Sequence, residues 1–154
     1  MKARRSRYEH QVLAQLRSAV PRHIRITLLA DRGFADTKLF ETLKSAMGFD
    51  YVIRFKAGTI IESSVGTVKT AAAWVLSNGQ AIRLVQPLMT RKRRRVPAVV
   101  CVKRAGMKQP WCLVTSRKDE AEAIIQLYAR RFDIEHSFRD QKDWRFGLAL
   151  DHMV

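Results

Sequence analysis

The segment 24-IRITLLAD-31 is a nearly continuous run of apolar and β-branched residues that ends in a carboxylate. Such a run is typical of a strand buried on both faces, as in a sheet that helices cover on either side. A helical pattern at 8–20 precedes it, and another at 37–47 separates it from a second buried run, 51-YVIRF-55. This helix–strand–helix–strand order predicts an α/β fold with parallel strand pairing.

The pattern changes after Lys56. Short apolar runs between turn residues predict a β-rich insertion with strands at 59–61, 73–76, 82–89, 98–102 and 111–115. From Ser63 to Lys118 the chain has 12 Lys and Arg residues and no Asp or Glu, and the run 91-RKRRR-95 falls between two of these strands. A solvated loop would explain that run alone. The imbalance across the whole insertion favours a surface that faces nucleic acid.

The composition of the chain points the same way. Its 154 residues include 29 Lys and Arg against 14 Asp and Glu, a net charge of +15 in a chain of single-domain length. No apolar run is long enough to span a membrane, and the N-terminus does not resemble a signal peptide. Cys101 and Cys112 lie in apolar runs and are expected to be core residues in a reducing compartment. These features predict a cytoplasmic, nucleoid-associated protein with a nucleic-acid partner and no membrane contact.

A last helix is predicted from an N-cap at Asp119 to about Asp143. At about 100° per residue, one sector of this helix carries apolar residues together with four polar ones. The polar four are Tyr128, Arg131, Glu135 and Lys142. A carboxylate on a face that docks against a sheet requires a cation. Two cations would serve Glu135: the side chain of Arg131 one turn away, or a metal ion.

Asp31 provides a second carboxylate. It ends a buried strand, at the edge where α/β sheets bind their ligands. A residue in this position often only forms a turn or caps a helix. Together, however, Asp31 and Glu135 would form a site for a hard divalent cation such as Mg²⁺, and such ions promote phosphoryl transfer.

The spacing of the four polar residues is distinctive. The last helix reads Tyr128-x2-Arg131-x3-Glu135-x6-Lys142. This spacing resembles the YREK signature of bacterial insertion-sequence transposases of the DDE class, in the group typified by insertion sequence four. The stretches 30-ADRGF-34 and 135-EHSFRDQKDWRFGLAL-150 are similar to the same family. The resemblance covers nearly the whole chain.

The resemblance implies an RNase H-like catalytic core with a β-rich insertion between its second and third acidic residues. Asp31 and Glu135 would then be the second and third acids and would bind Mg²⁺ or Mn²⁺. Tyr128, Arg131 and Lys142 would contact DNA phosphates. The basic run, Arg91, Lys92, Arg93, Arg94 and Arg95, is a further candidate DNA-binding segment.

The same resemblance implies a reaction and partners. The reaction would be cleavage at the ends of a mobile element, followed by transfer of the 3′ hydroxyl into target DNA. The partners would be double-stranded DNA, from the transposon ends and the target, and a second copy of the chain in a synaptic complex. We expect a partial core at 1–57, the basic insertion at 58–117, and a core helix with the signature at 118–154.

The first catalytic Asp of the family has no counterpart here, since Glu9 is the only acidic residue before Asp31. We therefore expect an incomplete core whose early strands are missing, from a truncated fragment that is inactive alone. A non-catalytic DNA-binding protein that competes with a full-length transposase is the alternative. A structural RNA-binding protein is a third possibility, but paired carboxylates on a docking face argue against it.

Overall fold

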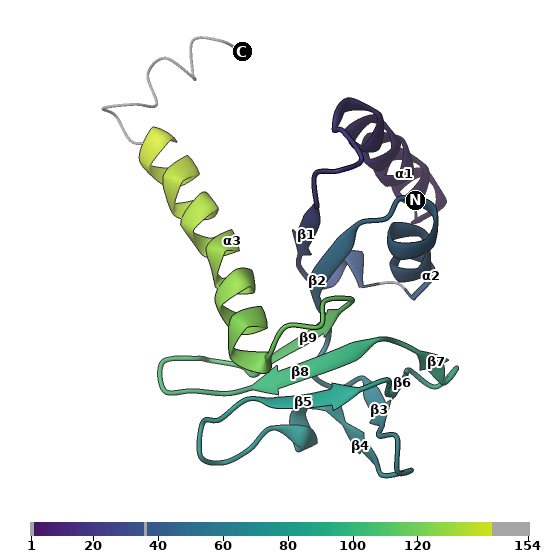
Figure 1. Ribbon diagram of the computed structural model, residues 1–154. Coiled ribbons are helices and arrows are strands. Elements are labelled where there is room, and N and C mark those ends of the chain that lie inside the picture. Colours follow the sequence, from purple (N-terminus) through teal and green to yellow (C-terminus); the bar gives the residue numbers. More distant parts are fainter. Residues whose placement is uncertain (1, 36, 143–154) are drawn as a thin grey trace.

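The computed structural model describes residues 2–35 and 37–142, except for the side chains of residues 2–6, 34 and 134–142. In this part of the chain, a central five-stranded sheet lies between helices, and a smaller four-stranded sheet lies beside it (Figure 1). The mixed α/β class predicted from the sequence is confirmed.

The central sheet combines both kinds of pairing. Its spatial order is β1 (Thr27–Ala30), β2 (Asp50–Arg54), β9 (Trp111–Thr115), β8 (Ala98–Val102) and β5 (Ile82–Val85). β1 and β2 pair in parallel, as predicted, with Leu29 opposite Val52. The remaining pairs are antiparallel. Asp31 follows the last residue of β1, so it lies at the edge of the sheet where β1 and β2 both end.

The second sheet holds the other strands of the basic region. Its order is β4 (Val68–Thr70), β3 (Ile60–Glu62), β6 (Leu88–Met89) and β7 (Arg94–Arg95). The strand predicted at 82–89 is broken because Gln86 adopts a left-handed conformation (φ 49°) and Pro87 has no N–H to donate. As a result β5 and β6 belong to different sheets.

The strand predicted at 73–76 is wrong. A 3₁₀ turn, η3 (Ala71–Trp74), takes up the first half of that segment, and no strand follows it there. Ala71 is buried, and the indole N–H of Trp74 donates to the carbonyl of Ile61 at 3.3 Å. This tertiary hydrogen bond and the alanine run favour a compact turn over an extended strand.

Strands from the basic region also extend the core sheet. β9 pairs directly with β2, with Val52 opposite Thr115. The sheet therefore continues across the boundary predicted at residue 57, and the division of the chain into three parts stays a prediction. Cys101 and Cys112 lie opposite each other on β8 and β9 and are buried in the core, as expected.

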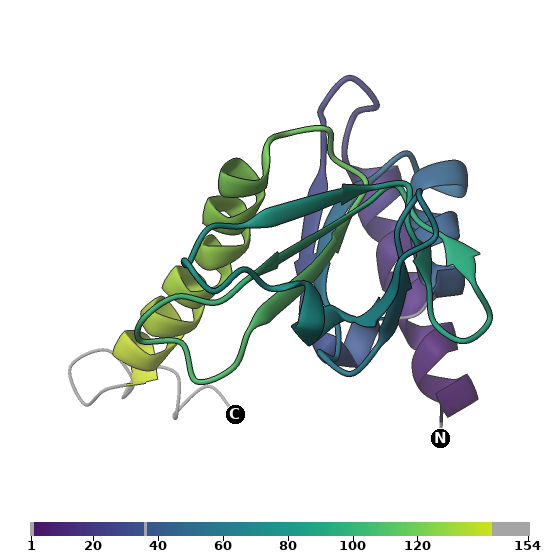
Figure 2. The same cartoon turned by 90° about the horizontal axis from the view of Figure 1, so that it is seen from below.

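Helices cover both faces of the central sheet. α1 (Lys2–Ala19), α2 (Thr37–Glu41) and the π-helical turn η2 (Thr42–Ala46) lie on one side, and α3 (Ala121–Lys142) lies on the other (Figure 1, Figure 2). Along β2, Tyr51 and Ile53 enter the cluster with α2, whereas Val52 enters the cluster with α3. Both faces of the strand are thus buried, as its apolar run predicted.

The docking face of α3 is the predicted one, because Ile124 and Tyr128 are fully buried against the sheet. Its start differs from the prediction: the helix begins at Ala121, and the Asp119 carboxylate accepts hydrogen bonds from Arg117 instead of capping it. Among the described helices, none is long and apolar enough to cross a membrane.

Candidate functional site

Asp31 lies at the end of β1 and begins a short 3₁₀ turn, η1 (Arg32–Phe34). Its Oδ1 accepts a hydrogen bond from the backbone N–H of Gly33 at 3.0 Å. The side chain is 47% exposed. Asp31 therefore caps the turn, but it keeps an accessible carboxylate at the edge of the sheet.

Arg131 reaches Asp31 from α3. Its Nη2 lies 3.1 Å from Asp31 Oδ2, and its side chain is 26% exposed. The two residues are 100 positions apart in sequence. The structure therefore brings together the strand end and the helix face that the sequence picked out separately. The contact is an ion pair at the rim of the interface between α3 and the sheet.

Tyr128 lies one turn before Arg131 and is completely buried. Its ring packs edge-on against Trp111, at 5.1 Å between centroids, and against Phe132 at 6.2 Å. Its hydroxyl makes no hydrogen bond within the described part of the chain. Burial raises the pKa of Tyr128, while the charges of Arg131 and Arg54 oppose that shift. Most buried hydroxyls in proteins have a hydrogen-bond partner, so this one calls for an explanation.

The other two residues of the predicted signature are only partly covered. α3 continues through Glu135 and Lys142, but their side chains lie outside the described residues. The pair between Arg131 and Glu135 therefore stays a prediction. Arg131 forms an ion pair with Asp31.

Asp31 is the candidate metal ligand whose side chain is described. No group of three or more His, Cys, Asp or Glu residues is present in that part of the chain. Asp31 fits a hard cation in chemistry and in access, because it offers carboxylate oxygens that are half exposed at a sheet edge. Any second carboxylate from α3 would come from the segment whose side chains are not described.

The basic run 91–95 divides into two parts. Arg93 turns back onto Glu62 and donates two hydrogen bonds, each 3.0 Å long, and Arg95 donates to the carbonyl of Gln86. Arg91 and Lys92 form the tip of the hairpin between β6 and β7 and make no ion pair with any described residue. All five side chains are exposed.

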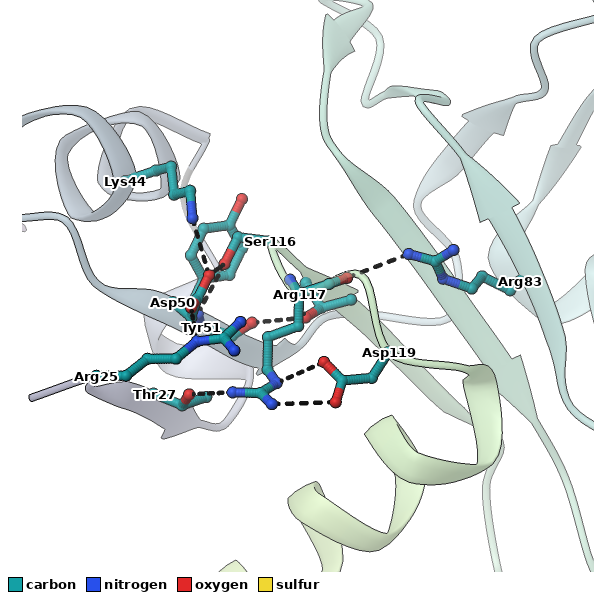
Figure 3. Close-up of polar contacts among 10 residues, drawn as sticks. Arg25, Thr27, Lys44, Asp50, Tyr51, Arg83, Ser116, Arg117 and Asp119 are labelled. Carbon is teal, nitrogen blue, oxygen red and sulfur yellow. Dashed lines mark hydrogen bonds and ion pairs between the residues drawn. The ribbon is translucent and has the colours of Figure 1, made fainter.

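Sequence reasoning missed a second polar cluster, at the opposite end of the central sheet. Figure 3 shows Asp50, the first residue of β2, receiving hydrogen bonds from three side chains. The donors are Arg25 at 2.7 Å, Lys44 at 2.9 Å and Ser116 at 2.9 Å. The Asp50 side chain is only 7% exposed. The one sequence signal was an acid directly before a buried strand.

The environment of Asp50 fixes its charge. Burial raises its pKa, but the hydrogen bonds from Arg25, Lys44 and Ser116 outweigh this effect and lower the pKa to about 2. Asp50 is therefore a carboxylate whose acceptor capacity is used within the fold. Asp50 pairs with Thr27 at the start of the parallel strands β1 and β2, so this cluster lies at the end of the sheet away from Asp31. Its hydrogen bonds connect three segments of the fold and stabilise it.

A comparison with protein families gives one match. The family described as "Transposase DDE domain" matches residues 2–153. No curated protein sequence matches the chain.

Proposed function

The chain belongs to the transposase DDE domain family, a family of DNA transposition proteins, and from this membership we propose that Asp31 and Glu135 carry metal-dependent DNA cleavage and strand transfer. The observation that supports the proposal best is the 3.1 Å contact between Asp31 and Arg131. It joins the end of β1 to the helix that carries Glu135, so an acid from each element would serve one site. We further propose that the group is the one typified by insertion sequence four, with an RNase H-like core.

Each side chain has a role in this proposal. Asp31 and Glu135 would hold a divalent cation, Mg²⁺ or Mn²⁺, which when bound stabilises charge that develops on a phosphate under attack. Arg131 supplies a planar guanidinium that can pair with a phosphate in two hydrogen bonds. It lies beside Asp31, so a phosphate at this edge would meet both residues.

The remaining signature residues would hold the DNA. Lys142 contributes a positive charge farther along α3. The Tyr128 hydroxyl is buried without a hydrogen bond to a described residue, so it would reach a phosphate only if α3 shifted on DNA binding. The cations of the 91–95 run would bind phosphates outside the cleavage site. Such contacts position the duplex without reading its sequence.

Cleavage of DNA that flanks the gene tests the proposal. The chain has no counterpart of the family's first catalytic Asp before Asp31, so we expect it to nick this DNA only beside a partner chain that supplies this acid, and then only with Mg²⁺ or Mn²⁺. Glu135→Gln and Asp31→Asn should each lower the nicking rate at least a hundredfold. Asp133→Asn is the matched control, because Asp133 is an exposed acid on the same helix. It should nick at the wild-type rate.

Affinity for the same DNA separates the outcomes. Glu135→Gln should bind DNA as tightly as wild type or more tightly, since one charge that repels phosphate is lost. Unchanged nicking by Glu135→Gln would overturn the catalytic assignment. DNA binding with no nicking by any form, even beside a partner that supplies the first acid, would mean that the chain is a non-catalytic DNA-binding protein.

A further inference from the structure

A pocket of about 990 Å³ lies between the core and the β6–β7 hairpin. One wall comes from η1 and α2, beginning at Arg32 and Gly33, which directly follow Asp31 in the sequence. The opposite wall comes from the hairpin, at Thr90, Arg91 and Lys92. The pocket therefore begins at the residues that follow Asp31, on the face of the central sheet that α1 and α2 cover, and the β6–β7 hairpin forms its other wall.

The lining of the pocket is strongly basic. Among the described residues that line it, five are Lys or Arg and one, Glu9, is a carboxylate. The five are Arg32, Lys38, Lys56, Arg91 and Lys92. All five cations are exposed, and apart from Lys38 they form no ion pair within the described residues. Cations that converge on one concave surface without local partners favour a polyanionic ligand.

The hairpin wall is held in a fixed shape. Thr90 and Arg93, on either side of the tip, adopt left-handed backbone conformations, with φ of 71° and 52°. This conformation is unfavourable for a β-branched residue such as Thr90, and it persists only where neighbouring contacts impose it. The double hydrogen bond from Arg93 to Glu62 and the bond from the Arg93 N–H to the Thr90 carbonyl provide those contacts. Arg93 therefore shapes the hairpin while Arg91 and Lys92 face the pocket.

We infer that this pocket holds the phosphate backbone of a DNA strand on its way to Asp31, clamped between the Arg32–Lys56 wall and the Arg91–Lys92 wall. The inference rests on the proposed function and identifies the surface that would lead DNA to the site. It assigns Arg32 and Lys56 to DNA binding, which the sequence did not indicate. It also divides the 91–95 run, with Arg93 kept for structure.

Fluorescence anisotropy with a labelled duplex of flanking DNA, measured from low to moderate salt, tests this inference. The variant Lys56→Gln/Arg91→Gln removes one charge from each wall. The control Arg22→Gln/Lys118→Gln removes the same two residue types from exposed positions before β1 and after β9, at the other end of the sheet. Thermal unfolding confirms that all variants fold.

We expect the pocket variant to bind the duplex about tenfold more weakly or worse, and the control to bind less than threefold more weakly. Each phosphate contact contributes about 0.9 to the slope of log affinity against log salt, so the slope should fall by about 2 in the pocket variant. Arg32→Gln/Lys56→Gln and Arg91→Gln/Lys92→Gln test the walls separately, and each should weaken binding.

The outcomes separate this inference from the proposed function. If the wild-type chain fails to bind the duplex, the proposed function fails and the inference falls with it. If wild type binds and the pocket variant loses no more affinity or salt slope than the control, DNA does not run through the pocket. That second result would leave the assignment of Asp31 and Glu135 intact.

Discussion

Arg131 on α3 donates a hydrogen bond to Asp31 at the end of β1, across 3.1 Å. At the other end of the same strand, Arg117 donates to the Thr27 hydroxyl at 2.8 Å, just before α3 begins. One arginine on α3 and one just before it thus contact the two ends of β1. The first contact is half exposed, whereas the second is largely buried.

The exposure of Asp31 predicts that its removal costs little stability. Asp31→Asn should change the free energy of unfolding by less than about 1 kcal/mol, because an exposed ion pair contributes little. An asparagine also keeps the acceptor that caps η1. Urea denaturation measures the first effect, and Mn²⁺ binding followed by electron paramagnetic resonance should show a loss of at least tenfold in affinity. A variant that unfolds easily but binds Mn²⁺ normally would make Asp31 a structural residue.

The buried phenol of Tyr128 leads to a prediction that separates packing from function. Tyr128→Phe should leave stability unchanged or slightly higher, because the hydroxyl is buried without a hydrogen bond to a described residue. Tyr128→Ala should cost about 3–5 kcal/mol, since it empties the space between Trp111 and Phe132. If the hydroxyl binds a phosphate, Tyr128→Phe should weaken DNA binding at full stability. Wild-type affinity in that variant would confine Tyr128 to the core.

Much of this architecture follows from local pattern. The apolar run before Asp31 and the face of α3 around Tyr128 each placed the correct residues against the sheet, because burial on a strand or helix follows a short period. The pairing of β9 with β2 did not follow, since residues 111–115 read equally well as part of a separate insertion. Pairing partners distant in sequence leave no local signal.

The polar contacts were harder to predict for a related reason. Arg131 had a predicted partner one turn away in Glu135, and the structure shows it in contact with Asp31, 100 residues earlier. Asp50 gathers donors from three segments, and none of Arg25, Lys44 or Ser116 stands out in the sequence. Likewise, Arg91 and Arg93 are equivalent in the run RKRRR. Only the turn between β6 and β7 sends one to the pocket and the other to Glu62.

The low pKa of Asp50 predicts a specific loss of stability in acid. Its pKa falls from an ordinary 3.8 to about 2 on folding, so the folded state binds this proton less readily than the unfolded state. The resulting stabilisation, about 2 kcal/mol, is complete above pH 3.8 and disappears as the pH falls through 2. Urea denaturation between pH 6 and 2 measures it.

Asp50→Asn is the control for that experiment. It should be less stable at pH 6 by about 3 kcal/mol, because Arg25 and Lys44 lose the charge they surround. Its stability should also fall less steeply below pH 4 than that of the wild type. Parallel acid profiles for the two proteins would show that other carboxylates cause the acid loss.

The last prediction concerns Arg117, which contacts the start of β1 from the segment just before α3. Its guanidinium bridges both oxygens of Asp119, at 2.9 and 3.0 Å, and the Thr27 hydroxyl. Arg117→Lys should cost about 2 kcal/mol although the charge is kept, because an ammonium cannot reproduce this planar fork. Hydrogen exchange should quicken in the first turns of α3, while Lys118→Gln, its exposed neighbour, should exchange as wild type does. Full protection of α3 in Arg117→Lys would mean that apolar packing of Ile124 and Tyr128 alone positions the helix.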